Sequence, residues 1–503
     1  MAPVSPDIQS PQDLAGRVEK LTSILDVAKA MAAARDLDLL LPLIIYEAAK
    51  VVDADRCTLF ILDREQGELW SKVAQGAAHE IRVKLGRGIA GSVAETGQVI
   101  NIQDAYADPR FNRDIDAATG YRTRTILCVP MRDAQGEVTG VLQALNRHVG
   151  VFTDEDAELL LALGGQAAGA IENALLHDEI NRLFEGFVSA AVVAIESRDP
   201  TTAGHSGRVA ALTVGLATAL EHESSGPYAR VRFGVQDVQE MRYASLLHDF
   251  GKVGVREHVL VKAEKLYPQE LDVLRARFAL ARKDRQLKSA ERRLEAARQD
   301  RLGAALDREE LDRLAAELRE LDETLEFVLA CNRPTILPSG GFERLTDLGR
   351  QNFRDERGVE HPLLVAREVE RLSIPRGSLS PDERLEIESH VSHTFRFLSQ
   401  IPWTRALKRV PDIAYAHHER LNGSGYPRKI PADTIPVQSK MMAISDVYDA
   451  LTAADRPYKK AVPHPAALDI LHQEAKSGML DGDLLRIFVE AEIPRRALRP
   501  PGF

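Results

Sequence analysis

Three segments far apart in the sequence carry neighbouring side chains that bind metals: His248 with Asp249, His417 with His418, and Asp446. Neutral imidazole and carboxylate groups are ligands for first-row transition metals, and no single segment supplies enough of them for a closed site. A site gathered from several helices, with coordination positions left open, is what metal-assisted hydrolysis requires. The pattern therefore predicts an enzyme whose metal centre is assembled by the fold.

Length, charge and cysteine usage limit the class of protein. The chain has 503 residues and a net charge of −10, which predicts about two to four domains and argues against a general nucleic-acid surface. Its three cysteines form neither a CxxC pair nor a disulfide framework, which favours a reducing compartment. No signal peptide is visible, and the apolar run at 39–49 is too short to cross a bilayer. We expect a cytoplasmic protein that binds neither nucleic acid nor membrane.

Hydrophobic periodicity divides the chain into an α+β block and a helical block. Short alternating runs that begin at Cys57 are typical of strands, and helical patterns flank them. From Asp154, the expected N-cap, to about Asp199 the pattern is almost continuously helical, and strand patterns nearly vanish beyond it. The expected fold is an α+β domain joined by a long helix to an all-α domain.

Residues 269–332 carry two heptad patterns, which predict a helical hairpin. The stronger seam runs from Leu311 to Val328 in steps of three and four, and Gly303 separates it from a weaker one. Seams this short leave open whether the helices pack on each other or pair with a second subunit. The weaker seam consists of Leu287, Ala290, Leu294 and Ala297.

Glycine, aspartate and aromatic residues recur at turns of the α+β block. They are Gly86 to Gly91, Thr96-Gly97, Asn101 to Tyr106, Asp108 to Phe111, Asp116, Thr119 to Tyr121, and Asn146 with Phe152. On these residues, positions 20–178 resemble GAF domains, which are small-ligand sensory modules, and residues 1–19 are expected to be a flexible N-terminus. The resemblance implies a central antiparallel sheet with flanking helices. Cys57 and Cys128 are expected to lie in the core.

The resemblance is greatest to GAF domains that bind cyclic nucleotides. Their Asn-Lys…Phe…Asp-Glu signature reads here as Asn146-Arg147, Phe152 and Asp156-Ala157. The alternative is that these residues brace the fold and that the domain serves only to dimerise. A cyclic nucleotide is the ligand that the resemblance implies, in a pocket formed by Asp104, Asp116, Thr119 and Asn146.

The second half carries a longer series of motifs in a fixed order. They are Glu196 to Pro200, Gly204 to Val209, Leu247 to Lys252, Ser389-His390, His417 to Pro427, Ile435-Pro436, Asp446 to Thr452 and Arg456 to Lys459. In this order they resemble HD-GYP phosphohydrolases, a branch of the HD superfamily that cleaves cyclic di-GMP. The resemblance places that domain at residues 179–503.

Carried over position by position, the HD-GYP resemblance implies a metal centre with substrate contacts beside it. The donors suit two divalent transition ions, iron or manganese, with Asp249 as a bridge. Some family members bind a third metal through a Glu where this chain has Thr201, so two ions are favoured. Asp449 is expected to support Asp446. The implied metal ligands are His205, His248, Asp249, His390, His417, His418 and Asp446; the implied catalytic residues are Asp249 and Lys252; and the implied substrate contacts are Lys252, Tyr426, Arg456 and Lys459.

The chain departs from the family pattern beside the metal motifs. Arg277 stands where the next His is expected, and that His returns only as His390. We infer an insertion at about 267–378 that contains the hairpin and either lids the catalytic domain or dimerises it. The alternative is an excursion into solvent.

The expected activity is hydrolysis of cyclic di-GMP to pGpG, GMP or both, regulated by the GAF domain in a homodimer. One alternative keeps the fold and changes the substrate to another cyclic dinucleotide or a nucleotide. Another is a catalytically silent receptor for a cyclic dinucleotide. The intact ligand set argues against the receptor, which has no need of seven metal-binding side chains.

Overall fold

The computed structural model describes residues 25, 27–31, 34, 36–71, 81–199, 203–301, 303–337, 340–453 and 461–497. The chain forms two compact units, Met1–Glu185 and Gly186–Phe503. Three positions singled out in the sequence, Thr201, Arg456 and Lys459, lie outside the described residues, as does the side chain of Thr119.

The N-terminal unit is built on an antiparallel sheet with the strand order β3-β2-β1-β6-β5-β4. The long strands β1 and β6 are paired at its centre, where Leu59 lies opposite Leu142. The α+β class and the antiparallel sheet are therefore confirmed. The strands are β1 (Ala54–Asp63), β2 (Glu68–Ser71), β3 (Ile81–Lys84), β4 (Ile100–Ile102), β5 (Ile126–Arg132) and β6 (Val138–Arg147).

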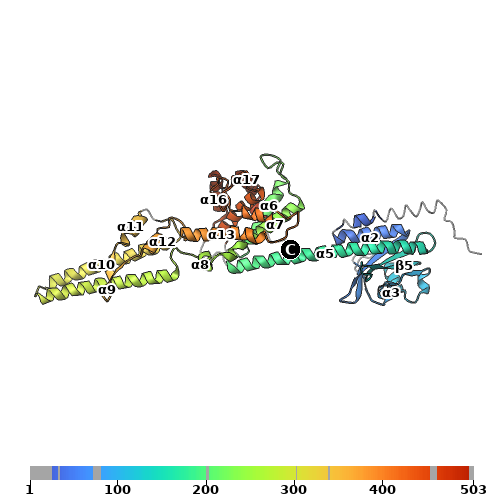
Figure 1. Cartoon of the computed structure of the whole chain (residues 1–503), viewed down its shortest axis with the longest axis horizontal. Helices are drawn as coiled ribbons and strands as arrows, with labels where there is room; N and C mark the ends of the chain where they lie inside the picture. Colours follow the sequence, from blue (N-terminus) through green and yellow to red (C-terminus); the bar gives the residue numbers. More distant parts are fainter. Residues whose placement is uncertain are drawn as a thin grey trace, which may run out of the picture. The chain divides into compact units, whose positions relative to one another are not determined.

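Helices cover both faces of this sheet (Figure 1). Helix α2 (Leu37–Val51) and the first turns of α5 (Asp154–Arg198) share one core with the sheet, and α3 (Gly88–Thr96) shares another with its opposite face. The strand alternation decides which side chain goes where, because Leu59 joins the first core and Phe60 the second. Cys57 and Cys128 are free and buried, as predicted. Two short helices, η1 (Ala105–Ala107) and α4 (Arg113–Thr119), connect β4 to β5.

Helix α5 begins at the predicted residue but with a different cap. Thr153, not Asp154, is the capping residue, because its hydroxyl accepts the N–H of Asp156 at 3.2 Å and the Asp156 carboxylate accepts the N–H of Thr153 at 2.9 Å. The helix also contains an 18-residue window with a mean hydropathy of 1.4, which by length and composition could cross a membrane. Half of that window is buried inside the structure, as in the core helix of a globular domain, so this finding is weak evidence for a membrane span.

The C-terminal unit is helical around a core built from distant segments, in which Leu216 of α6 and Phe488 of α17 are fully buried. The helical class predicted for this half is confirmed. Its helices outside the predicted insertion are α6 (His205–Leu220), α7 (Val235–Leu247), η3 (Phe250–Gly254), α8 (Glu257–Leu260), α13 (Pro381–Leu398), α14 (Val410–Tyr415), α15 (Val437–Thr452), α16 (His464–Lys476), α17 (Gly482–Glu490) and α18 (Ile493–Ala497).

Residues 267–378 form a body with its own core, in which Leu274 and Val328 are fully buried. Two long helices run antiparallel, because Arg292 pairs with Glu310 at 2.9 Å and Arg293 with Asp307 at 2.6 Å. The hairpin extends from the rest of the unit in Figure 1. The elements are α9 (Pro268–Arg298), α10 (Ala304–Asn332), α11 (Gly341–Leu348), β7 (Asn352–Arg354), β8 (Glu360–Pro362) and α12 (Ala366–Leu372).

The hairpin does not use both predicted seams. The stronger seam on α10 does enter the core, where Leu321 and Val328 are buried. The weaker seam on α9 does not, because Leu287 and Leu294 are more than half exposed, and Ala290 and Ala297 are exposed as well. A different face of α9 meets α10, through Leu274, Phe278 and Ala281.

A cluster of charged side chains fastens this body to α13. Glu383, near the start of α13, accepts from Lys262 Nζ at 2.6 Å and from the Tyr267 hydroxyl at 2.8 Å. Arg371 lies 3.5 Å from the same carboxylate and also pairs with Glu270 of α9. Burial alone would raise the pKa of Glu383, but Lys262, the N–H of Ser380 and Tyr267 outweigh it and lower the pKa to about 2.

Replacing Glu383 by Gln should therefore lower the free energy of unfolding by about 1 to 2 kcal/mol at neutral pH. A carboxylate whose pKa is lowered in the folded state stabilises the fold at any pH above its pKa in the unfolded state. It loses that contribution as the pH falls and the carboxylate is protonated. The difference between wild type and Glu383→Gln should thus shrink as the pH falls from about 4.5 toward 2. Chemical denaturation at several pH values measures it, with the exposed neighbour Asp382→Asn as the control. An equal loss of stability at every pH would contradict this account.

Candidate metal centre

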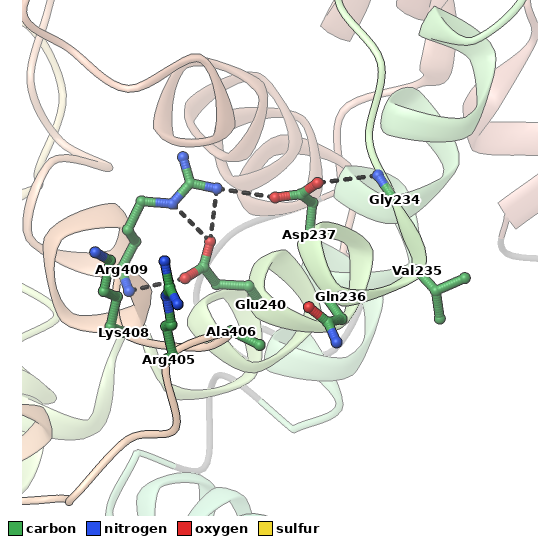
Figure 2. A pocket seen from close by; sticks show the side chains of 9 residues that line it. All are labelled: Gly234, Val235, Gln236, Asp237, Glu240, Arg405, Ala406, Lys408 and Arg409. Carbon is green, nitrogen blue, oxygen red and sulfur yellow. Dashed lines mark hydrogen bonds and ion pairs between the residues drawn. The ribbon is translucent and has the colours of Figure 1, made fainter. Parts of the chain in front are cut away.

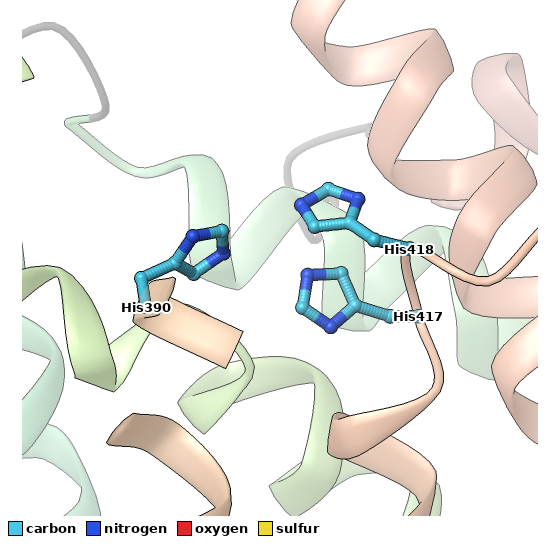
Figure 3. Close-up of side chains that lie close together, drawn as sticks. All are labelled: His390, His417 and His418. Atoms are coloured by element: carbon cyan, nitrogen blue, oxygen red, sulfur yellow. The ribbon is translucent and has the colours of Figure 1, made fainter. Parts of the chain in front are cut away.

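The side chains expected to bind metal come together in the C-terminal unit. His205 opens α6, His248 and Asp249 lie where α7 passes into η3, and His390 lies in α13. His417 and His418 follow α14, and Asp446 lies in α15. Three groups of donors each have all their ligand atoms within 4.8 Å of one another. The groups are His390, His417 and His418 (Figure 3); His205, His248 and Asp446; and His248, Asp249 and His417.

The carboxylate of Asp249 lies between these groups. Its Oδ1 is 3.2 Å from His390 Nε2, and its Oδ2 is 3.5 Å from His248 Nε2 and 3.8 Å from His205 Nε2. The two oxygens therefore face different donor groups. A bridging carboxylate between two cations needs this arrangement.

Backbone hydrogen bonds orient three of the imidazoles in the same way. In His248, His390 and His417, Nδ1 lies 2.7, 2.5 and 2.6 Å from the carbonyl oxygen of the residue three positions earlier. A carbonyl only accepts, so Nδ1 carries the proton and Nε2 presents its lone pair. Each of these Nε2 atoms is buried, and among the described residues none has a hydrogen-bond partner.

This arrangement favours a bound cation. The Nε2 lone pairs of His248 and His390 face the acceptor oxygens of Asp249 at 3.5 and 3.2 Å, and acceptors turned toward one another repel. Burial strengthens the repulsion, because little water screens it. Imidazole and carboxylate donors fit a divalent transition metal, which would satisfy them together.

The protonation states of three of the donors favour the same conclusion. Burial lowers the pKa of His248, and burial with the neighbouring His248 and His390 lowers the pKa of His417 to about 3. Burial alone would raise the pKa of Asp249, but the cationic Lys252 at 2.8 Å outweighs it and holds that pKa well below its usual range. At neutral pH these groups are a neutral imidazole pair and an ionised carboxylate, the forms in which each binds a metal.

His205 is oriented by a side chain. Its Nδ1 donates to Asp449 Oδ2 at 2.7 Å, and Arg208 Nε donates to Asp449 Oδ1 at 2.7 Å. Asp449 was expected to support Asp446, but the contacts of its carboxylate are to His205 and Arg208. Burial alone would lower the pKa of His205, but hydrogen bonds to Asp446 and Asp449 raise it to about 9. A carboxylate behind a ligand histidine fixes the ring and increases its basicity.

Two further residues hold η3 against α13, and the sequence pattern indicated neither role. Thr394 donates its hydroxyl to the carbonyl of His248 at 3.0 Å and accepts the N–H of Gly251 at 2.8 Å. A Cβ on Gly251 would lie 1.9 Å from the carbonyl oxygen of His390. Glycine is therefore required where the two segments that carry these donors cross.

The predicted substrate contacts that the structure describes lie on the rim of the centre. Lys252 Nζ is 2.8 Å from Asp249 Oδ2 and 3.3 Å from Asp199 Oδ2. The Tyr426 ring lies 4.7 Å from that of His418, and a Cβ on Gly425 would be 2.5 Å from the His418 carbonyl oxygen, so the loop packs tightly. Glu419 closes the loop by accepting the N–H of Arg428 at 2.7 Å.

A hollow of about 410 Å³ at the start of α7 contains none of the donors (Figure 2). It is lined by Arg405, Lys408 and Arg409 on one side and by Asp237 and Glu240 on the other. Arg409 pairs with Glu240 at 2.9 Å and with Asp237 at 3.0 Å. The charge of Arg409 in this hollow is therefore already balanced by two carboxylates of the same hollow.

In the N-terminal unit, the polar residues expected to bind a ligand brace loops. Asp116 is buried and accepts from the Tyr106 hydroxyl and from both the N–H and the hydroxyl of Thr123. Asn146 accepts the N–H of Arg124 at 2.6 Å and donates to the Tyr121 hydroxyl at 2.9 Å.

Of the other two expected pocket residues, the structure describes the side chain of Asp104 alone. Asp104 caps η1 by accepting the N–H of Tyr106. A hollow of about 390 Å³ in this unit is lined by residues of β1, β5, β6 and α5, and by none of the four expected residues. These contacts match the alternative in which the motif residues of the GAF domain brace its fold and do not bind a ligand.

Comparison with known proteins assigns a different family to each of the two units. Residues 36–171 match the family described as GAF domain, and residues 364–484 match the family described as HD domain. The chain therefore combines a GAF domain with an HD-family domain. HD domains bind divalent metals, and His390, His417, His418 and Asp446 lie inside that match, whereas the other three donors precede it.

Individual relatives resemble part of the chain. A probable 3',5'-cyclic phosphodiesterase of Caenorhabditis elegans is 40% identical over 27% of the chain and 20% of its own length. A dual 3',5'-cyclic-AMP and -GMP phosphodiesterase of Takifugu rubripes is 37% identical over 30% of the chain and 18% of its own length. The chain thus spans about a fifth of the length of these two relatives. The GAF domain of a phosphoenolpyruvate-protein phosphotransferase from Coxiella burnetii is 25% identical over 32% of the chain and 98% of its own, with a TM-score of 0.30.

The contact between Asp449 and His205 gives a test of the centre. Asp449→Asn removes the charge behind the imidazole and should weaken metal binding by about 10- to 100-fold. Metal titration of the purified protein, followed by calorimetry, measures it. Asp469→Asn, at an exposed position on α16, should leave the affinity unchanged. Equal affinity in both variants would mean that Asp449 serves only the fold.

Proposed function

We propose that the C-terminal unit is a metal-dependent phosphodiesterase that hydrolyses cyclic di-GMP to pGpG, GMP or both. The observation that carries the proposal is the buried Asp249 carboxylate, whose two oxygens face separate groups of imidazole lone pairs. Two divalent ions, iron or manganese, would satisfy both groups. Bound there, such ions would supply a hydroxide at neutral pH and stabilise negative charge on the phosphorus.

The residues around the centre have separate roles in this proposal. His205, His248 and Asp446 would hold one ion, and His390, His417 and His418 the other. Asp249 would bridge them. Lys252 would bind a non-bridging phosphate oxygen, because its ammonium lies beside the bridge and its side chain is 15% exposed. Burial alone would lower the pKa of Lys252, but Asp249 and Asp199 raise it, so the side chain stays cationic.

Support for a cyclic dinucleotide comes from the loop that follows the histidine pair. Gly425, Tyr426 and Pro427 match the motif of the HD-GYP branch, and the Tyr426 ring lies 4.7 Å from that of His418, whose side chain is 21% exposed. A purine could stack there. The curated relatives are named for cyclic mononucleotides, so cyclic GMP and cyclic AMP are the competing substrates.

We also propose that the GAF domain regulates this activity in a homodimer. A cyclic nucleotide remains the proposed ligand of that domain. A reducing cytoplasm remains the proposed location, with all three cysteines free and buried.

Removal of one ligand should show whether hydrolysis depends on the bound metal. His390→Ala should lose bound metal and hydrolysis together, because His390 faces the bridging carboxylate at 3.2 Å. The exposed His472→Ala on α16 should keep both. Metal counting after anaerobic purification and chromatographic identification of the products measure the two properties. A chelator should abolish activity, and Fe²⁺ or Mn²⁺ should restore it.

The other outcomes have definite meanings. Hydrolysis of cyclic GMP at a higher kcat/KM than cyclic di-GMP would mean that the protein is a phosphodiesterase whose preferred substrate is cyclic GMP. Tight binding of cyclic di-GMP by the metal-loaded protein without any product would favour the silent receptor.

Lys252→Met should lower kcat/KM by about a hundredfold or more, because it removes a charge that faces the substrate phosphate. Metal content should stay at the wild-type level, since lysine is not a ligand. Steady-state kinetics and metal counting on the same preparation test both statements. Unchanged kinetics would assign Lys252 to a structural role beside Asp199.

A further inference from the structure

We propose that the outward face of α9 is a self-association surface on which a second copy of this chain packs antiparallel. The surface, termed here the α9 stripe, is the row of exposed side chains at heptad positions a and d. It consists of Val273, Ala276, Leu280, Lys283, Leu287, Ala290, Leu294 and Ala297.

Periodicity distinguishes this stripe from ordinary exposed apolar residues. Val273, Leu280, Leu287 and Leu294 follow one another at intervals of seven and are 58%, 45%, 55% and 54% exposed. Single exposed leucines are normal on protein surfaces. Four heptads of a and d positions with one charged member are instead the pattern of a coiled-coil seam, about 36 Å long.

The hairpin itself does not need the stripe. The opposite face of α9 already packs on α10, where Leu274, Phe278 and Ala281 are buried. Ion pairs from Arg292 to Glu310 and from Arg293 to Asp307 close the same side. Within the described part of the chain, the stripe therefore stays uncovered.

The stripe is complementary to itself in the antiparallel direction. The a positions are Val or Leu and three of the four d positions are Ala, and an antiparallel copy brings each a opposite a d. Val273 then faces Ala297 of the second copy, and Leu280 faces Ala290. Leu287 faces Lys283, whose aliphatic stem can cover it while the ammonium reaches water.

A parallel copy fits less well. In register it would place Lys283 against Lys283 and would alternate layers of paired leucines with layers of paired alanines. Charge at the flanks does not oppose association, because the e and g positions of the four heptads carry three arginines and three acidic residues. A twofold antiparallel pair is also the closed arrangement for one repeated surface. The flanking residues are Asp272, Arg277, Asp284, Glu291, Arg293 and Arg298.

Disulfide trapping tests both the contact and its direction in the full chain. Two differently tagged chains, one with Leu280→Cys and the other with Ala290→Cys, are expressed together and oxidised. The antiparallel pair puts these positions opposite each other, whereas two copies of either position lie about 15 Å apart along the axis. We expect the mixed disulfide to exceed either disulfide between identical chains. The three native cysteines can stay, because all are buried.

A charge in the stripe provides the second measurement. Leu287→Lys in both chains places like charges opposite each other at Lys283 and should reduce the mixed disulfide by about tenfold or more, the change expected for a loss of one decade in affinity. Phe342→Lys, at another exposed apolar residue of the same body, should not reduce it. Thermal unfolding of each variant verifies that it is folded.

Three results would overturn the proposal. One is a yield of the mixed disulfide between positions 280 and 290 no higher than the yield between a chain with Leu280→Cys and a chain with Phe342→Cys. Another is a dominant disulfide between two chains with cysteine at 280, which would mean parallel pairing. The third is a mixed disulfide that Leu287→Lys does not reduce. A dimer held elsewhere in the chain does not produce the expected result, because the disulfide reports contact at α9 itself.

Discussion

The C-terminal unit depends on a repulsion around Asp249 that Lys252, 2.8 Å from its Oδ2, relieves only in part. The Asp249 carboxylate is buried, and the lone pairs of His248 and His390 are turned toward it by hydrogen bonds to their own backbone. Without a cation these acceptors would oppose one another in a medium that screens poorly. Gly251 and Thr394 nevertheless hold the crossing of η3 and α13 in place, so the packing around them maintains the arrangement. Stability given up locally for binding is common at functional sites.

Helix α13 also connects the centre to the body formed by residues 267–378. Glu383 joins Lys262, Tyr267 and Arg371 at the start of α13, about two helical turns before His390. The body that contains the hairpin is therefore attached to a helix that carries a donor of the centre. This attachment does not by itself make it a regulator, since rigid packing and a bistable element would share these contacts.

The GAF domain illustrates how far a resemblance extends. Its sheet, its helices and its buried cysteines agree with expectation, because they follow from periodicity that every member of the fold shares. Asp116 and Asn146 occupy the motif positions, yet their polar groups are engaged by Thr123, Tyr121 and Arg124. A motif records residue type, and the same carboxylate can hold a loop or a ligand.

The sequence by itself determined the α+β and helical classes, the two helices of the hairpin and the donor types of the centre, because these depend on local periodicity and on side-chain chemistry. Tertiary structure alone decided that Asp449 orients His205 rather than supporting Asp446. It also decided which face of α9 meets α10, since both Phe278 and Leu287 belong to apolar rows of one helix. Local pattern cannot choose between two such faces, because the choice depends on the packing energy of segments that meet only in the folded chain.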